Sequence, residues 1–233
     1  MNAVVHLQPA LILQHRHYRE SSELLEVFTQ DYGIISILAK GVRKEKSKLA
    51  GLLQPFSVLR ISYLDKNELK VLIQAEYVTV FTLQRLGLYC GFYVNELLLR
   101  FLHHYDPHPE LFNRYQQCLQ ELSQTDSIEQ TLRYFELDLL MAAGYGVQLA
   151  TDCLTQTSIQ AGLRYDFLAG EGMTSHAAGI VTGNTLQIMA NRGVMDATAL
   201  AEAKPLLRKM LDLHLQGRPL QSRAVLAKII KYL

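Results

Sequence analysis

Apolar and polar residues alternate through the first eighty residues in the pattern of short β-strands. Leu59, Ile61 and Tyr63, for example, fall on one face of an extended run while the residues between them fall on the other. A period of two is typical of a half-buried strand. We expect five strands, over residues 8–15, 24–29, 33–39, 56–64 and 69–80. Five short strands are too few for a sandwich and favour a small closed barrel of the oligonucleotide-binding (OB) type.

From about residue 84 the period becomes helical. Tyr89, Tyr93, Leu97 and Phe101 recur every four positions, and a similar stripe follows the Pro107–Pro109 break. This spacing predicts helices that pack into one core. The sequence therefore predicts an α+β fold, with an OB barrel over residues 1–80 and an α-helical domain over residues 81–233.

Several residues mark expected helix ends. Ser127 begins a capping box whose helix should stop at Gly144. Asp196 offers an N-cap, Pro205 should lie in the first turn of the next helix, and Gly217 should end it. Ser222 should cap a final helix over residues 223–233. Between these helices, residues 150–195 are rich in glycine, and we expect an irregular insertion there with room for short strands.

Composition supports a globular protein. Of the 233 residues, 49% are hydrophobic and 19% are charged, which excludes a disordered chain. No apolar window is long enough to span a membrane, and the first residues do not resemble a secretory signal. The three cysteines are too few for a disulfide framework, so we expect a reducing cytoplasm.

The charges are distributed unevenly, although the net charge is only +1. One cluster follows the third expected strand and is opposed only by Glu45; it consists of Lys40, Arg43, Lys44, Lys46 and Lys48. Such a cluster can bind a polyanion, although charge runs are often only solvated loops. On an OB barrel the polyanion-binding interpretation is favoured, because these barrels hold single nucleic acid strands with a basic groove and aromatic stacking. Phe56 and Tyr63 could supply the stacking, but they fit the barrel core at least as well.

The carboxy-terminal thirty residues form a second basic region. Residues 204–233 hold seven lysines and arginines against a single acidic residue, Asp212. Lys209, Arg218 and Arg223 are candidates for a second anion site, for nucleic acid or an acidic peptide. The alternative is that cations near helix ends only complement the helix dipole.

The sequence contains no recognisable catalytic motif. There is no phosphate-binding G-x-x-x-x-G-K-[ST], no G-x-S-x-G and no H-E-x-x-H. The histidines between His103 and His108 lack the spacing of metal ligands, and no Cys-x-x-Cys pair exists. We therefore expect no enzymatic activity, no cofactor and no bound metal.

Several short motifs, in this order along nearly the whole chain, resemble the RecO family of bacterial recombination-repair proteins. The matching segments are residues 18–22 (YRESS), 27–29 (VFT), 39–43 (AKGVR), 53–56 (LQPF), 93–97 (YVNEL), 135–140 (FELDLL), 144–147 (GYGV) and 219–223 (PLQSR). The resemblance implies an OB barrel followed by a helical domain. Many members also carry a four-cysteine zinc finger after the Gly-Tyr turn. Only Cys153 stands in that region, so the chain resembles the zinc-free type found in gamma-proteobacteria.

The resemblance also implies a function. Members of the family bind single- and double-stranded DNA, anneal complementary strands and bind the acidic tail of single-stranded DNA-binding protein (SSB). With RecR they help to load RecA onto coated DNA, which implies a cytoplasmic, nucleoid-associated protein with no membrane partner. On this basis we expect the five loop cations, Phe56, Lys209, Arg218 and Arg223 to contact DNA. We expect Arg133, Lys204 and Arg208 to receive the SSB tail. An OB-type RNA-binding module and a non-catalytic protein scaffold are the alternatives.

Overall fold

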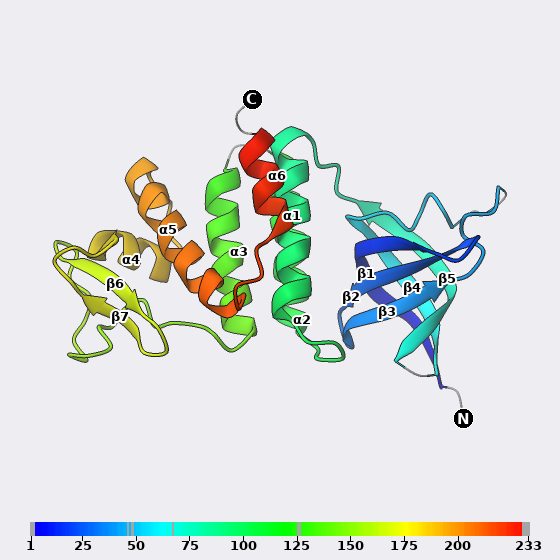
Figure 1. Ribbon diagram of the computed structural model, residues 1–233, viewed down its shortest axis with the longest axis horizontal. Coiled ribbons are helices and arrows are strands. Elements are labelled where there is room, and N and C mark those ends of the chain that lie inside the picture. The colour runs from blue at the N-terminus through cyan, green and yellow to red at the C-terminus, as the bar shows by residue number, and fades with distance from the viewer. Residues whose placement is uncertain (1–2, 46, 48, 67, 125–126, 230–233) are drawn as a thin grey trace. The chain divides into compact units, whose positions relative to one another are not determined.

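The computed structural model shows a mixed α+β chain that packs as two compact units (Figure 1). Unit 1 comprises residues 1–125 and 222–233, and unit 2 comprises residues 126–221. The structure describes residues 3–45, 47, 49–66, 68–124 and 127–229. The predicted change from strands to helices after residue 80 is confirmed. The packing boundary lies elsewhere, because the first two helices belong to the same unit as the strands.

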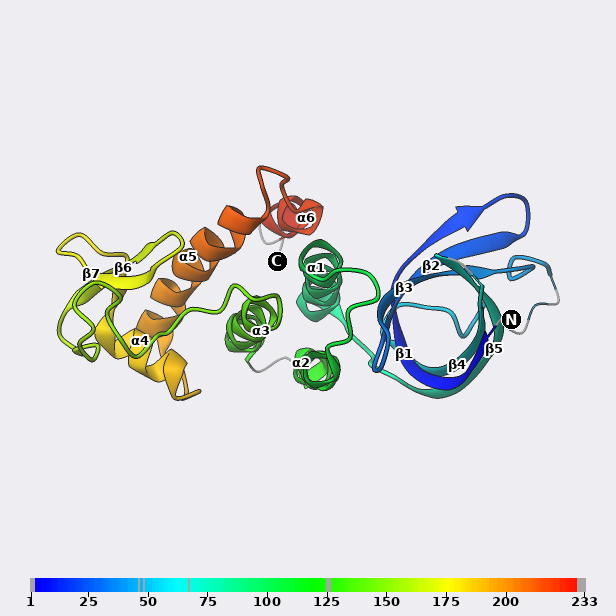
Figure 2. The same cartoon turned by 90° about the horizontal axis from the view of Figure 1, so that it is seen from below.

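Five strands of unit 1 close into a barrel in the order β1-β2-β3-β5-β4, which Figure 2 shows end-on. Their bounds are β1 Ala3–Tyr18, β2 Ser22–Thr29, β3 Gly33–Ala39, β4 Ser57–Asp65 and β5 Leu69–Val80. All five predicted strands are confirmed. Only β1 is much longer than expected, because its first half pairs with β4 and its second half with β2. The first half does not alternate cleanly, so periodicity did not reveal it.

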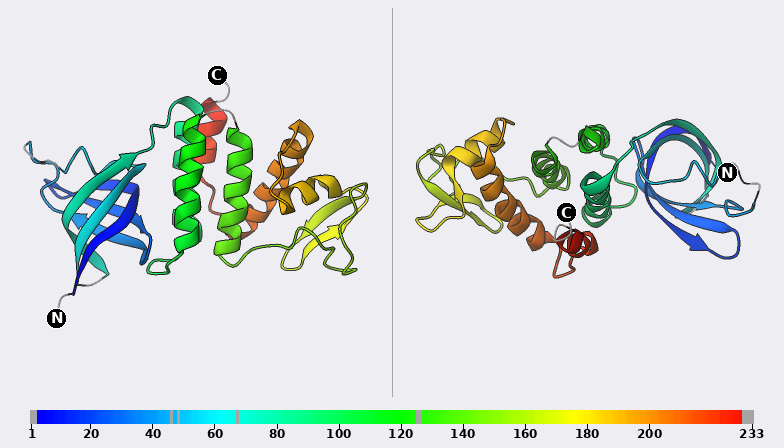
Figure 3. Two further views of the ribbon diagram at one scale, coloured as in Figure 1. Left: turned by 180° about the vertical axis from the view of Figure 1, so that it is seen from behind. Right: turned by 90° about the horizontal axis from the view of Figure 1, so that it is seen from above.

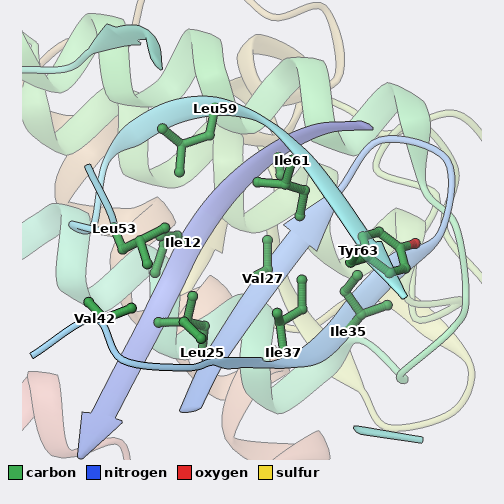
Figure 4. Close-up of a cluster of buried hydrophobic side chains, with 12 residues drawn as sticks. Ile12, Leu25, Val27, Ile35, Ile37, Val42, Leu53, Leu59, Ile61 and Tyr63 are labelled. Carbon is green, nitrogen blue, oxygen red and sulfur yellow. The ribbon is translucent and has the colours of Figure 1, made fainter. Parts of the chain in front are cut away.

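The barrel interior is filled by alternate residues of the strands. Figure 4 shows Ile12, Leu25, Ile37 and Leu59 among the side chains that meet there, and each is at most 1% exposed. Two further residues, Val42 and Leu53, come from the β3–β4 loop and join the same cluster. This loop is therefore anchored to the barrel at both of its ends.

The seam between β3 and β5 is short. Residues 36–38 of β3 pair in parallel with residues 69–71 of β5. Earlier in β3, the connector between the first two helices takes the place of a strand: the Tyr105 amide donates to the Ile34 carbonyl, and the Tyr105 hydroxyl donates to the Glu68 carbonyl. The connector can approach this closely because Gly33 has a positive φ of 66° and no side chain that would collide with the Asp106 backbone.

Three helices complete unit 1: α1 Arg85–Phe101, α2 Pro109–Gln124 and α6 Gln221–Ile229, whose first residue is the last of unit 2. Aromatic residues join the barrel to α2, with the rings of Phe28 and Phe112 edge-to-face at 5.4 Å. The side chain of Asn95 on α1 donates to the Leu13 carbonyl of β1. Glu96 accepts hydrogen bonds from the amide and the hydroxyl of Ser222, which attaches α6 to α1.

Unit 2 contains the region expected to be irregular, and that region is ordered. It forms an antiparallel sheet in the order β7-β6-β8, which packs with α4 and α5 (Figure 3). The elements of this unit are α3 Ile128–Ala142, β6 Arg164–Leu168, β7 Gly172–Ser175, β8 Val181–Thr182, α4 Gly183–Ala190 and α5 Ala197–His214. The short strands allowed for in the sequence are therefore present, but as a regular sheet rather than an irregular insertion.

The helix-end predictions have mixed outcomes. Asp196 caps α5 by accepting from the Ala199 amide, and Gly144 and Gly217 follow their helices with positive φ, as expected. Ser127 stands at the start of α3 but makes no side-chain capping hydrogen bond. Two expectations were wrong: Pro205 lies inside α5, and Ser222 lies within α6, where its hydroxyl donates to Glu96 instead of capping.

No helix in the described part of the chain is long and apolar enough to cross a membrane.

Candidate nucleic-acid interface

The loop after β3 presents cations at the surface of the barrel. Lys40, Arg43 and Lys44 are exposed, whereas Val42 between them is only 1% exposed and lies in the barrel core. Gly41 turns the backbone with a φ of 69°, and the Lys44 amide closes the turn on the Gly41 carbonyl. The buried valine fixes the turn, so the flanking cations must point outward. Two other predicted contacts, Lys46 and Lys48, lie outside the described residues.

The hairpin between β1 and β2 lies against this loop and adds another cation. The Arg43 amide donates to the Ser21 carbonyl at 3.0 Å, and the Arg43 guanidinium reaches the Arg19 carbonyl at 3.4 Å. Arg19 is exposed, and its guanidinium lies 5.3 Å from the centre of the Tyr18 ring. We call Arg19, Lys40, Arg43 and Lys44 the cationic surface.

Its electrostatics suit an anionic ligand. Among the described residues, none of the four cations of this surface forms an ion pair with an acidic side chain. Exposed Glu20 and Glu45 lie nearby in sequence and lower its net charge. Arg19 is not among the contacts predicted from the sequence. No contiguous sequence signal connects Arg19 to the loop, because the hairpin is brought beside it only by the strand register, in which Glu23 of β2 pairs with Ala39 of β3.

The aromatic residues considered for base stacking are buried. Phe56 is 5% exposed, and its ring meets Phe92 of α1 edge-to-face at 5.1 Å. Tyr63 is 1% exposed and lies in the barrel core, and burial raises the pKa of its hydroxyl well above the usual range. A base cannot stack on a ring that has no exposed face. The placement of Phe56 at the DNA interface is therefore corrected to a core role.

The DNA contacts predicted in the carboxy-terminal region are divided between the two units. Lys209 on α5 is paired with Asp166 of β6 at 2.8 Å. The pKa of the Asp166 carboxyl is lowered. Burial alone would raise this pKa, but the hydrogen bonds from Lys209 and the Phe167 amide outweigh the effect of burial. Arg218 is exposed in unit 2, and Arg223 belongs to unit 1, where its guanidinium lies 5.9 Å from the Tyr93 ring.

The three residues expected to receive an acidic tail differ in accessibility. Lys204 and Arg208 lie one turn apart on α5, with side chains 60% and 68% exposed, and each is weakly paired at the surface, with Glu129 and Asp212. Arg133 on α3 is instead buried. Its guanidinium donates to Glu136 at 2.8 Å, and both side chains are less than 10% exposed. Arg133 is therefore not the surface cation that the sequence suggested, because an internal carboxylate already holds it.

No metal centre is visible in the described ranges: no group of three histidine, cysteine or acidic side chains lies close enough to hold an ion. Near Cys153, the loop is organised by a carboxylate instead. Asp152 accepts hydrogen bonds from the amides of Leu154, Thr155 and Ser175.

Comparison with known proteins covers nearly the whole chain. Residues 1–81 match the family model "Recombination protein O N terminal", and residues 83–224 match "Recombination protein O C terminal". A DNA repair protein RecO from Nitrosococcus oceani is 41% identical over 229 residues, covering 96% of this chain and 93% of the relative. RecO proteins of Methylococcus capsulatus and Photobacterium profundum are 40% and 38% identical, over 93% of this chain in each case and 91% and 94% of the relatives.

These matches agree with the strand-to-helix order of the fold and with the motifs found in the sequence. The exposed cationic loop on the barrel is the kind of basic patch that nucleic-acid-binding proteins present. The chain belongs to the RecO family of DNA repair and recombination proteins.

Proposed function

We propose that this protein binds single- and double-stranded DNA, anneals complementary strands and, with RecR, helps to load RecA onto SSB-coated DNA. The observation that carries the proposal is the cationic surface, whose loop is anchored in the barrel core by Val42 and Leu53. No covalent bond is made or broken in annealing, so the protein needs binding surfaces and no catalytic group. It would work at the nucleoid in the cytoplasm.

The physical task in annealing is to bring two polyanions together. Their phosphates repel one another, and cations of the protein reduce this repulsion while releasing counterions from the DNA. The cationic surface would hold one strand. Lys209, Arg218 and Arg223 would contribute further contacts, and the Asp166 partner of Lys209 reduces the contribution of that residue.

Access to SSB-coated DNA would come through the acidic SSB tail. Lys204 and Arg208 are exposed on one face of α5 and can pair with carboxylates of the tail. Arg133 would take part only by exchanging its internal partner Glu136 for the tail, and we propose a smaller role for it. RecR and RecA are proposed as partners on the basis of family membership.

A strand-annealing assay over a salt series tests the DNA-binding proposal. Arg43→Ala/Lys44→Ala should weaken binding of single-stranded DNA and slow annealing. The slope of log affinity against log salt should decrease by about 0.7 for each phosphate contact that is lost. Arg60→Ala/Lys228→Ala is the matched control, because it removes the same charge from exposed positions outside the cationic surface. Equal affinity and slope in the two double variants would refute the assignment. Preferential binding of RNA in competition would favour an RNA-binding module, and no DNA binding at low salt would favour a scaffold.

Binding of a labelled peptide of the SSB tail tests the role proposed for Lys204 and Arg208. Lys204→Ala/Arg208→Ala should weaken binding of the peptide at least about tenfold, since each substitution removes an exposed partner for a carboxylate. Annealing of naked strands should be nearly unchanged, while annealing of SSB-coated strands should slow. If the double variant binds the peptide as tightly as the parent protein, the tail binds elsewhere.

A further inference from the structure

The tip of the β1–β2 hairpin carries an arginine in an unusual backbone conformation. Arg19 has a positive φ of 54°, in the left-handed region that glycine adopts freely and that other residues seldom adopt. Glycine would turn the chain here with less strain, but it would provide no side chain. The turn itself therefore does not require an arginine, and the guanidinium is the feature that needs a role.

The guanidinium of Arg19 lies over an aromatic ring. Its Cζ is 5.3 Å from the centre of the Tyr18 ring, within the range of about 6 Å for a cation–π contact. Tyr18 is half-buried, and its backbone is fixed by pairing with Ser22 across the hairpin. The ring thus supports the guanidinium from one side, while Arg19 itself is exposed.

An arginine of unit 2 has a similar geometry and different surroundings. Arg192 also has a φ of 54°, and its guanidinium lies 5.0 Å from the centre of the Tyr134 ring. That guanidinium also donates to the Asp138 carboxylate and to the Tyr134 carbonyl, so its partners come from within the chain. For Arg19, no hydrogen bond or ion pair joins the guanidinium to any residue that the structure describes. The contrast indicates that Arg19 faces a ligand.

Two contacts fix the hairpin tip beside the loop cations. The Arg43 amide donates to the Ser21 carbonyl at 3.0 Å, and the Arg43 guanidinium donates to the Arg19 carbonyl at 3.4 Å. A DNA strand whose phosphate binds Arg43 therefore passes next to the hairpin tip. A base of that strand can then reach the exposed side chain of Arg19.

We propose that Arg19 stacks on a base of single-stranded DNA, with the Tyr18 ring behind it. This inference rests on the proposed DNA binding and adds a contact with bases, which the buried rings of Phe56 and Tyr63 cannot make. A planar guanidinium stacks on aromatic faces, and every base has such a face, so the contact suits strands of any sequence. Bases inside a duplex are covered by their neighbours, so the contact is specific to single strands.

A phosphate contact is the alternative role for Arg19. Lysine also binds phosphate, as a point charge, but its compact ammonium lacks the plane that stacks on a base. Arg19→Lys keeps the charge and removes the plane, and therefore separates the two roles. Arg19→Gly suits the positive φ and removes the side chain without straining the hairpin.

The test measures binding of the full chain to a short oligothymidine, to an abasic strand of the same length and to duplex DNA. The parent protein should prefer oligothymidine over the abasic strand by about fivefold or more, the effect of one stacked base. Arg19→Lys should lose this preference, with its affinity for the abasic strand and the duplex unchanged. Arg19→Gly should lose it too, without loss of thermal stability. Arg60→Lys, at an exposed position outside the cationic surface, is the control and should keep the preference.

Three results would overturn the inference. Equal binding of the two strands by the parent protein would mean that no base is stacked. A preference that survives in Arg19→Lys would assign the stacking to another group. Equal weakening of all three ligands by Arg19→Lys would make Arg19 a phosphate contact.

A further variant separates this inference from the proposed function. Lys44→Gln removes a charge from the cationic surface and leaves the hairpin unchanged. It should weaken binding of both single strands by the same factor and lower the salt dependence. That result supports DNA binding by the cationic surface even if the preference for bases is absent. Binding of neither strand by the parent protein would refute both the proposed function and the role of Arg19.

Discussion

At the scale of single residues, Asn95 shows how one polar side chain joins three elements. It lies on α1 and is 2% exposed. Its amide nitrogen donates to the Leu13 carbonyl of β1 at 2.9 Å, and its amide oxygen accepts from the Tyr115 hydroxyl of α2. Burial raises the pKa of the Tyr115 hydroxyl, which therefore remains a donor. Asn95 belongs to the YVNEL motif, so part of that motif serves the architecture of unit 1.

Asn95→Ala should destabilise unit 1 by about 2–4 kcal/mol, because it leaves a buried hydroxyl and a buried carbonyl without their partner. Urea unfolding followed by circular dichroism measures the loss; the chain has no tryptophan to follow by fluorescence. Gln120→Ala, at an exposed position of α2, is the control and should change stability by less than about 0.5 kcal/mol. A small effect of Asn95→Ala would mean that water replaces the lost bonds.

Asp152 organises the loop that precedes β6. Its side chain is buried, and it accepts from the amides of Leu154, Thr155 and Ser175. Burial alone would raise the pKa of this carboxyl. The hydrogen bonds to its ionised form outweigh burial and lower the pKa from 3.8 to about 2.

The stability of unit 2 should therefore depend on pH through Asp152. A carboxyl whose pKa is lower in the folded state stabilises the fold above its unfolded pKa of 3.8, and this contribution is lost as the pH falls toward about 2. Asp152→Asn should cost about 2 kcal/mol at neutral pH. The difference from the parent should shrink between pH 5 and pH 2 in chemical denaturation. A difference that is constant across this range would contradict the assignment.

At the scale of elements, the barrel strands were predictable because their inward residues alternate with outward ones. Leu59, Ile61 and Tyr63 are all buried as that pattern requires. The sheet of unit 2 was not predictable in the same way, since its strands have only two to five residues and no period can be established over that length. Ser127 has the right residue type for a cap, but its backbone geometry does not place the hydroxyl on an amide.

The candidate interface was predictable only where its residues are contiguous. Lys40, Arg43 and Lys44 could be recognised as one loop, whereas Arg19 joins them through the pairing of β2 with β3. The burial of Arg133 depends on Glu136 and on the packing around α3, neither of which has a signature in the sequence. Charge alone therefore identified cations correctly but not their accessibility.

Close packing of α1 against α2 depends on a helix-interior glycine. A side chain at Gly87 would lie 2.5 Å from the carbonyl oxygen of Leu122, which is backbone and cannot move alone. Alanine favours a helix by about 1 kcal/mol over glycine. The collision should cost more, so we expect Gly87→Ala to lose about 1–2 kcal/mol net. Thermal unfolding measures the change, with Gly51→Ala as the control because nothing lies within 4 Å of that position. A gain in stability would show that the helices separate readily.

At the scale of the whole molecule, the chain leaves unit 1 after residue 125 and returns to it at Ser222. The return is held by the two hydrogen bonds from Ser222 to Glu96 and by the contact of Arg223 with the Tyr93 ring. No residue of α6 is fully buried, so these polar contacts carry much of its attachment.

Glu96→Ala should release α6. We expect amide exchange over Gln221–Ile229 to accelerate by about tenfold or more, since two hydrogen bonds to a carboxylate are lost. Exchange in β6 and β7 of unit 2 should not change. Glu110→Ala removes an exposed carboxylate from α2 and is the control. Unchanged exchange in α6 would show that its remaining contacts are sufficient.

The return of the chain to unit 1 affects how the protein is made. A ribosome finishes the barrel, α1 and α2 early, yet the helix that completes this unit is synthesised only after all of unit 2. Until α6 has been synthesised, the face of α1 that binds it therefore remains uncovered. A premature stop codon at Ser222 would therefore remove α6 from unit 1, although every residue of unit 2 would still be made.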